Sequence, residues 1–135
     1  MLKKNPTILV VDDDLDTVQL LRLALQRAGY RVFTATSWED VSDRLMLIER
    51  EFETIDLIIL DIMMPNRSGF DVLLSLKVLL HPVPPVIFLS AKCAIEDMVK
   101  ASDLGAAKYL VKPTTPNKLI SVVEEVLEQT KKRMM

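Results

Sequence analysis

Residues 8–18 read ILVVDDDLDTV, with an apolar run directly before three consecutive aspartates. A short run of aliphatic and β-branched residues is typical of a buried strand, and the acids come where that strand should end. Two carboxylates ~4 Å apart, at an effective dielectric constant of ~20, repel each other by about 4 kcal/mol. The stretch therefore predicts a strand whose end carries an acidic site, together with a positive group that offsets the repulsion.

Similar apolar runs recur along the chain. They are TILVV (7–11), RVFTA (31–35), DLIIL (56–60), PVIFLS (85–90) and KYLV (108–111), and a segment with helical periodicity separates each run from the next. Parallel strands need crossover connections, and here the crossovers are helices. The chain is predicted to fold as an α/β three-layer sandwich with a five-stranded parallel sheet. The second run alternates in polarity and is expected at an edge.

The segments between the strands have apolar residues at spacings of three and four, which predicts five amphipathic helices. The predicted inward stripes are Val18, Leu21, Leu25 and Ala28; Val41, Leu45, Ile48 and Phe52; Val72, Leu73, Leu76 and Leu80; Ile95, Met98, Val99 and Leu104; and Leu119, Val122, Val123, Val126 and Leu127. Ser37 with Asp40 is a candidate capping box, and Thr115 is a candidate N-cap.

Composition limits the class of protein. The 135 residues suit one domain over 1–135, and half of them are apolar. Seventeen basic against nineteen acidic residues give a net charge of −2, so nucleic-acid binding by this chain is not expected. The single cysteine, Cys93, cannot form an internal disulfide, and neither a signal peptide nor an apolar run long enough for a bilayer is present. We expect a cytoplasmic protein without membrane contact.

Chemistry-bearing residues stand at the ends of four predicted strands. Asp12 and Asp13 follow the first strand and Asp61 follows the third, while Ser90 closes the fourth and Lys112 follows the fifth. Ligands of doubly wound sheets bind outside the carboxyl ends of the strands, so we expect these groups to converge. Carboxylates without nearby His or Cys favour Mg²⁺, and a carboxylate beside Mg²⁺ and a lysine can attack a phosphoryl group.

The segments ILVVDDD, DLIILDIMMPNRSGFDVL, VIFLSA and LGAAKYLVKP resemble, in order and spacing, the receiver domain of bacterial two-component response regulators over nearly the whole chain. The resemblance implies a flavodoxin-like doubly wound sheet in the order 2-1-3-4-5. It also implies that Asp61 is the phosphoacceptor and that Asp12, Asp13, Asp61 and the backbone carbonyl of Met63 bind Mg²⁺.

The same resemblance implies roles for the remaining strand ends. Ser90 and Lys112 would contact phosphoryl oxygens, and the Lys112–Pro113 peptide would be cis. On phosphorylation, Ser90 would move inward and Tyr109 would rotate inward, which changes the surface of the fourth helix, fifth strand and fifth helix. Asp14 is expected in the first turn of the first helix, where its negative charge would interact favourably with the positive end of the helix dipole.

By resemblance the chain is a regulatory domain, not an enzyme on external substrates; it catalyses only its own phosphorylation and dephosphorylation. The implied partners are a histidine kinase or histidine phosphotransfer protein, a downstream effector or output domain, and a second copy in a phosphorylation-dependent homodimer. Lys108 stands where the winged-helix DNA-binding branch has an acid in its dimer network, which weighs against that mode of dimerisation.

The sequence fits three other interpretations less well. A phosphohydrolase of the aspartyl-phosphate type would carry a second aspartate two residues after Asp61, where this chain has Met63. A flavin-binding module would need a hydroxyl- and glycine-rich loop after the first strand, and DDDLDTV would repel the phosphate. A constitutive interaction domain on the same fold, never phosphorylated, does not explain the complete set of acids, hydroxyl and lysine.

Overall fold

The computed structural model describes residues 5–50, 54–91 and 94–134, and a five-stranded parallel sheet lies at its centre. The strands are β1 (Thr7–Val11), β2 (Arg31–Ala35), β3 (Leu57–Asp61), β4 (Val86–Ser90) and β5 (Lys108–Val111). The helices are α1 (Leu15–Arg27), α2 (Trp38–Arg50), α3 (Gly69–Leu79), α4 (Ile95–Asp103) and α5 (Pro116–Met134). The predicted bounds of β1, β2 and β5 are confirmed, whereas β3 is shifted by one residue and includes Asp61.

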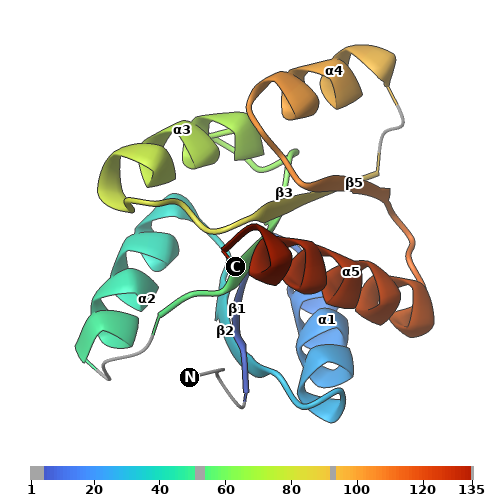
Figure 1. Cartoon of the computed structure of the whole chain (residues 1–135). Coiled ribbons are helices and arrows are strands. Elements are labelled where there is room, and N and C mark those ends of the chain that lie inside the picture. Colours follow the sequence, from blue (N-terminus) through green and yellow to red (C-terminus); the bar gives the residue numbers. More distant parts are fainter. Residues whose placement is uncertain (1–4, 51–53, 92–93, 135) are drawn as a thin grey trace.

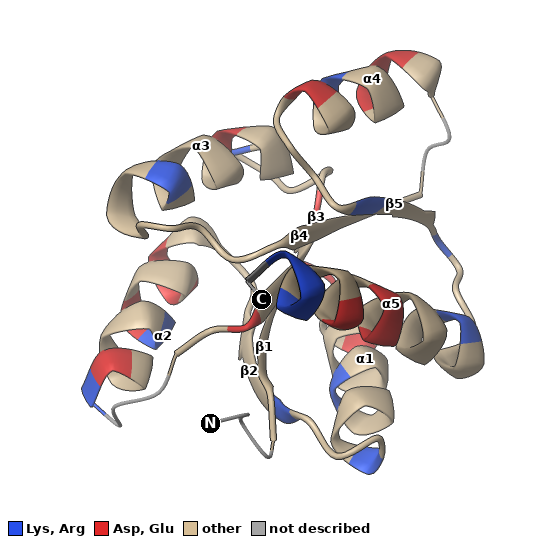
Figure 2. Cartoon of the chain, in the orientation of Figure 1, with Lys and Arg blue, Asp and Glu red and all other residues tan. Residues whose placement is uncertain are grey.

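The strand order is β2-β1-β3-β4-β5, as the resemblance implied. Helices α1 and α5 cover one face of the sheet, and α2, α3 and α4 cover the other (Figure 1). Every residue of β1, β3 and β4 is buried, while β2 at the edge is only partly so. Charged residues lie mostly on the outer helices (Figure 2). In the described part of the chain, no helix combines the length and apolarity needed to cross a bilayer.

The packing of four predicted stripes is confirmed in its main contacts, and the stripe predicted around α4 is wrong except at Leu104, which packs against the core. Ile95, Met98 and Val99 were expected to face the core, but they are 75%, 41% and 53% exposed, and Ala101 is the residue of α4 that is buried. Periodicity identifies an apolar stripe and does not show whether another element covers it. Ala28, predicted to be buried on α1, is also exposed; Phe52 and Cys93 lie outside the described residues.

Two lysines connect α4 to α3. The ammonium of Lys77 on α3 donates to the carbonyl oxygen of Leu104, the C-cap of α4, at 2.6 Å. Lys100 on α4 places its ammonium 4.7 Å from the ring centroid of Phe70, which in turn packs edge-on against Phe88 of β4. Because α4 buries little apolar surface, these polar contacts provide a large share of its attachment.

The N-caps of the first two helices differ in detail from the predictions. Asp14 is the N-cap of α1, not a first-turn residue: its carboxylate accepts hydrogen bonds from the Thr17 hydroxyl (2.7 Å) and the Asp16 N–H (3.3 Å). At α2 the Ser37 hydroxyl accepts from the Asp40 N–H, as expected. The Asp40 carboxylate, however, accepts from the N–H and hydroxyl of Thr36, one residue before the cap.

The start of α3 is pressed against the end of β3. The Gly69 N–H donates to the Ile62 carbonyl at 2.8 Å, and the Ser68 hydroxyl caps the helix by accepting from the Asp71 N–H. A Cβ atom on Gly69 would lie 2.3 Å from the backbone oxygen of Asp61, closer than any real contact. Only glycine therefore allows α3 to begin beside the acidic end of β3.

We expect Gly69→Ala to destabilise the fold by about 2–3 kcal/mol, because the added methyl group must push α3 away from rigid backbone. Val78→Ala, at a position of α3 that is 74% exposed, is the matched control and should change stability by less than about 0.5 kcal/mol. Urea unfolding followed by circular dichroism measures both. Equal midpoints for Gly69→Ala and the unmodified protein would show that α3 can begin elsewhere.

Candidate functional site

Acidic side chains from two neighbouring strands meet at one edge of the sheet. β1 and β3 are paired with Val11 opposite Leu60, so Asp12 and Asp61 come at adjacent strand ends. Both are almost fully buried, with 1% and 3% exposure, while Asp13 is exposed. Carboxylate oxygens of these three residues lie within 4.8 Å of one another. The predicted convergence of Asp12, Asp13 and Asp61 is present.

Lys112 provides the positive group that the sequence analysis expected. Its ammonium nitrogen lies 2.6 Å from Asp12 Oδ2 and 3.4 Å from Asp61 Oδ2. The backbone N–H of Lys112 donates to the carbonyl of Ser90 at 2.7 Å, which ties the end of β5 to the end of β4. The Lys112–Pro113 peptide is cis, as the resemblance implied, and Ser90 is fully buried.

Backbone N–H groups hold the two buried carboxylates in place. The Asp14 N–H donates to Asp12 Oδ1 at 2.9 Å, and the Met63 N–H donates to Asp61 Oδ1 at 3.1 Å. Each of these bonds engages Oδ1 and leaves Oδ2 directed toward Lys112. The two acids are thus oriented by the residues that follow them in the chain.

The charges of the cluster are only partly balanced. The pKa of Asp61 is raised to about 7, chiefly by burial and secondly by the Asp12 carboxylate, and the Met63 N–H and Lys112 oppose this rise. Burial also favours neutral Lys112, but its hydrogen bond to Asp12 and the charges of both aspartates raise its pKa above the ordinary value overall. One ammonium group therefore faces more negative charge than it neutralises.

The donor set fits a hard divalent cation. Asp12 Oδ2 is buried and, apart from its ion pair with Lys112, has no hydrogen-bond partner. All three clustered side chains offer carboxylate oxygens, which are the ligands that Mg²⁺ prefers. A cation at this position would give the buried Asp12 oxygen a second positive partner and reduce the mutual repulsion of the acids.

Tyr109, the second predicted switch residue, belongs to the core on the α2, α3 and α4 side of the sheet. It lies on β5 opposite Phe88 of β4 and packs, half-buried, against the core beneath α3 and α4.

The sequence analysis did not single out Gly69, although a lone glycine shortly after Asp61 could have indicated a close approach of the chain. The ligand role of the Met63 carbonyl stays a prediction.

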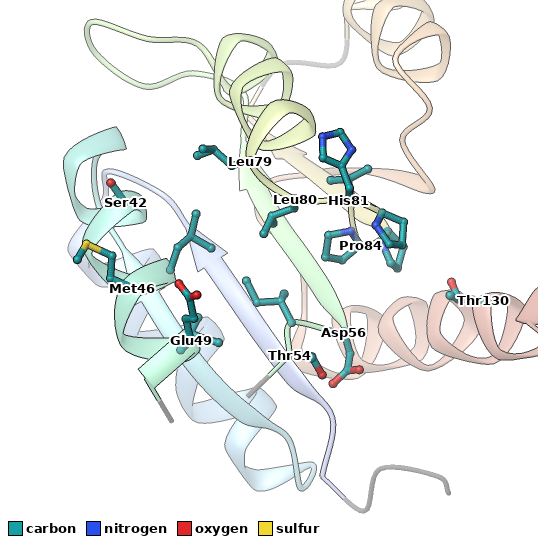
Figure 3. A pocket seen from close by; sticks show the side chains of 16 residues that line it. Ser42, Met46, Glu49, Thr54, Asp56, Leu79, Leu80, His81, Pro84 and Thr130 are labelled. Atoms are coloured by element: carbon teal, nitrogen blue, oxygen red, sulfur yellow. The ribbon is translucent and has the colours of Figure 1, made fainter. Parts of the chain in front are cut away.

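A separate cavity of about 820 Å³ opens near the amino ends of β3 and β4, at the opposite end of the strands from the acidic site (Figure 3). It is lined by α2, by the end of α3 with the following proline-rich segment, and by Thr54, Ile55 and Asp56 before β3. Because Asp56 precedes β3 and Asp61 ends it, this cavity is not part of the acidic site.

Comparison with known proteins agrees with this geometry. The family model described as "Response regulator receiver domain" matches residues 8–124. Alkaline phosphatase synthesis transcriptional regulatory protein PhoP of Bacillus subtilis is 36% identical over 93% of this chain and 50% of its own length. The chain spans about half the length of the curated relatives it matches.

Solved structures give the same result. The CheY-like response regulator receiver domain protein of Methanospirillum hungatei superposes with a TM-score of 0.81 at 27% identity, over 96% of this chain and 98% of the other. The BeF3-activated receiver domain of Thermotoga maritima DrrB gives 0.77 at 31% identity, over 92% and 98%. With its strand order, its acidic strand ends and these matches, the chain belongs to the response regulator receiver domains of two-component signal transduction.

Proposed function

We propose that Asp61 accepts a phosphoryl group from the phosphohistidine of a histidine kinase or histidine phosphotransfer protein. The observation that carries the proposal is the contact of a buried Asp61 carboxylate with Asp12 and Lys112 at the carboxyl ends of the strands. In the transfer, an Asp61 oxygen forms the new bond to phosphorus as the phosphorus–nitrogen bond of the donor breaks, and the donor imidazole keeps the electron pair and takes a proton.

The side chains around Asp61 have separate roles in this proposal. The Met63 N–H holds Oδ1, so Oδ2 is the oxygen that faces Lys112 and the incoming phosphorus. Lys112 neutralises one phosphoryl oxygen and the Ser90 hydroxyl donates to another. Asp12, Asp13, Asp61 and the Met63 carbonyl would hold Mg²⁺, which supplies charge neutralisation for the phosphoryl oxygens.

The output surface is formed by α4, β5 and α5. Ser90 and Tyr109 would transmit phosphorylation to it, and the exposed Ile95, Met98 and Val99 of α4 give a downstream effector, output domain or second copy an apolar surface to bind. Lys108 forms an ion pair with Glu125 of the same chain at 3.0 Å, which supports the view that it does not join an intermolecular network. We place this single domain, residues 1–135, in the cytoplasm.

Phosphoryl uptake tests the assignment of Asp61. Incubation with acetyl phosphate and Mg²⁺ should add the mass of one phosphoryl group, and Asp61→Asn should abolish the addition because the nucleophilic oxygen is lost. Asp16→Asn, which changes an exposed acid in the first turn of α1, is the control and should be labelled like the unmodified protein. Labelling that persists in Asp61→Asn would place the phosphoacceptor elsewhere.

Metal binding tests the acidic cluster. We expect Asp13→Asn to weaken Mg²⁺ binding by at least about tenfold, because it removes one of three clustered carboxylates. The Asp16→Asn variant should bind Mg²⁺ with unchanged affinity in isothermal titration calorimetry. If both variants bind equally well, Asp13 is not a ligand.

Asp61 should also reduce the stability of the metal-free protein. Its pKa is about 7 in the folded state against 3.8 for an ordinary aspartate, so ionising it costs folding free energy as the pH rises between these values. In excess EDTA, Asp61→Asn should be more stable than the unmodified protein by on the order of 1–3 kcal/mol above pH ~7.5, with a smaller difference at pH ~5. Urea unfolding at both pH values measures the difference; a gap that does not grow with pH contradicts the predicted repulsion.

A further inference from the structure

The segment that follows the phosphoacceptor strand, residues 62–68, is here called the 62–68 loop. Near its start, the Met63 N–H orients Asp61 by donating to Oδ1 at 3.1 Å. At its end, the Gly69 N–H donates to the carbonyl of Ile62 at 2.8 Å and closes the loop upon itself. The position of the nucleophilic carboxylate therefore depends on how the rest of this loop is held.

Arg67 anchors the loop to two other elements. Its guanidinium carbon lies 4.7 Å from the ring centroid of Trp38, the first residue of α2. The same guanidinium donates to the carbonyl of Asp71 at 3.2 Å and, in a short contact, to the hydroxyl of Ser75 on α3. Its Nε atom is buried without a hydrogen-bond partner, so the Trp38 ring face compensates for part of its desolvation.

Two further features describe the place where the 62–68 loop meets the start of α2. A small cavity of about 90 Å³ is lined by residues 36–39 on one side and 64–67 on the other, so the segment before α2 faces the 62–68 loop. Asn66 has φ of 72°, in the left-handed region, which asparagine tolerates better than most residues but still at a free-energy cost that the surroundings offset. Arg67, the next residue, is anchored on both sides.

We propose that Trp38 and Arg67 are positioning residues for phosphoryl transfer to Asp61: their contact holds the 62–68 loop so that the Met63 N–H aims Asp61 Oδ2 at the phosphorus. The inference rests on the proposed function and adds to it a constraint from α2. Phosphoryl transfer depends on alignment of the attacking oxygen, so a loosened loop lowers the rate without removing any reacting group.

The variants distinguish positioning of the 62–68 loop from a loss of apolar packing and from electrostatic attraction of the phosphoryl donor. Trp38→Leu keeps apolar bulk and removes the aromatic face, Trp38→Phe restores a face, and Arg67→Gln removes the cation. The control is Arg31→Gln, which removes a comparable contact of Arg31 with the Phe33 ring (5.8 Å) at the start of β2. Circular dichroism and urea unfolding establish that each variant is folded.

The measurement is the rate of Asp61 labelling by acetyl phosphate with saturating Mg²⁺. We expect Trp38→Leu and Arg67→Gln to be slower by about 3–10-fold, Trp38→Phe to recover most of the rate, and Arg31→Gln to match the unmodified protein. The Met63 amide resonance should shift in the two slow variants and stay in place in the control. The decrease in labelling rate caused by Arg67→Gln should be equal at ~0.05 M and ~0.5 M salt, because salt screens attraction between charges and not the alignment of the loop.

The possible results are distinguishable. If the unmodified protein is not labelled at all, the proposed function fails, and this inference with it. If the unmodified protein is labelled and Trp38→Leu reacts equally fast with an unmoved Met63 amide, only the positioning role is overturned. If the effect of Arg67→Gln disappears at high salt, Arg67 attracts the anionic donor and does not position the loop.

Discussion

The ion pair of Lys112 with two buried carboxylates is the interaction on which the site depends. Asp12 and Asp61 could not be buried side by side without it, since each desolvated charge costs several kcal/mol and their mutual repulsion adds to that cost. The pairing is incomplete, because one ammonium group faces two buried acids and the exposed Asp13. This unsatisfied negative charge favours a divalent cation beside the three carboxylates.

The parallel arrangement of the strands brings these groups together. All strands of the sheet end at the same edge, so residues far apart in the sequence become neighbours when each follows a strand. Asp12 comes from β1, Asp61 from β3 and Lys112 from the end of β5, while Ser90 ends the intervening strand β4. The crossover helices keep the strand ends in register, and Gly69 lets α3 start directly against β3.

Much of this could be predicted from the sequence, because the relevant signals are local. Apolar runs ending in Asp12 and Asp61 identified both the strands and the acids, and the general rule for strand ends placed Lys112 beside them. The exposed face of α4 could not be predicted, since the spacing of Ile95, Met98 and Val99 describes a stripe without naming its partner. The contact of Arg67 with Trp38 was not predicted either, because it joins a loop to the start of a helix and their approach is determined by the whole fold.

Helix α4 packs against the rest of the fold through few buried side chains, and this has an energetic consequence. Helix α4 buries one alanine and is attached through Lys77 and Lys100, whereas α5 has three fully buried side chains on its inner face. A hydrogen bond to a charged group is worth about 1.5–3 kcal/mol and a cation–π contact about 0.5–2 kcal/mol, so the two lysine contacts together stabilise the position of α4 by a few kcal/mol at most. The position of α4 therefore depends on a few polar contacts, whereas that of α5 depends on buried apolar surface.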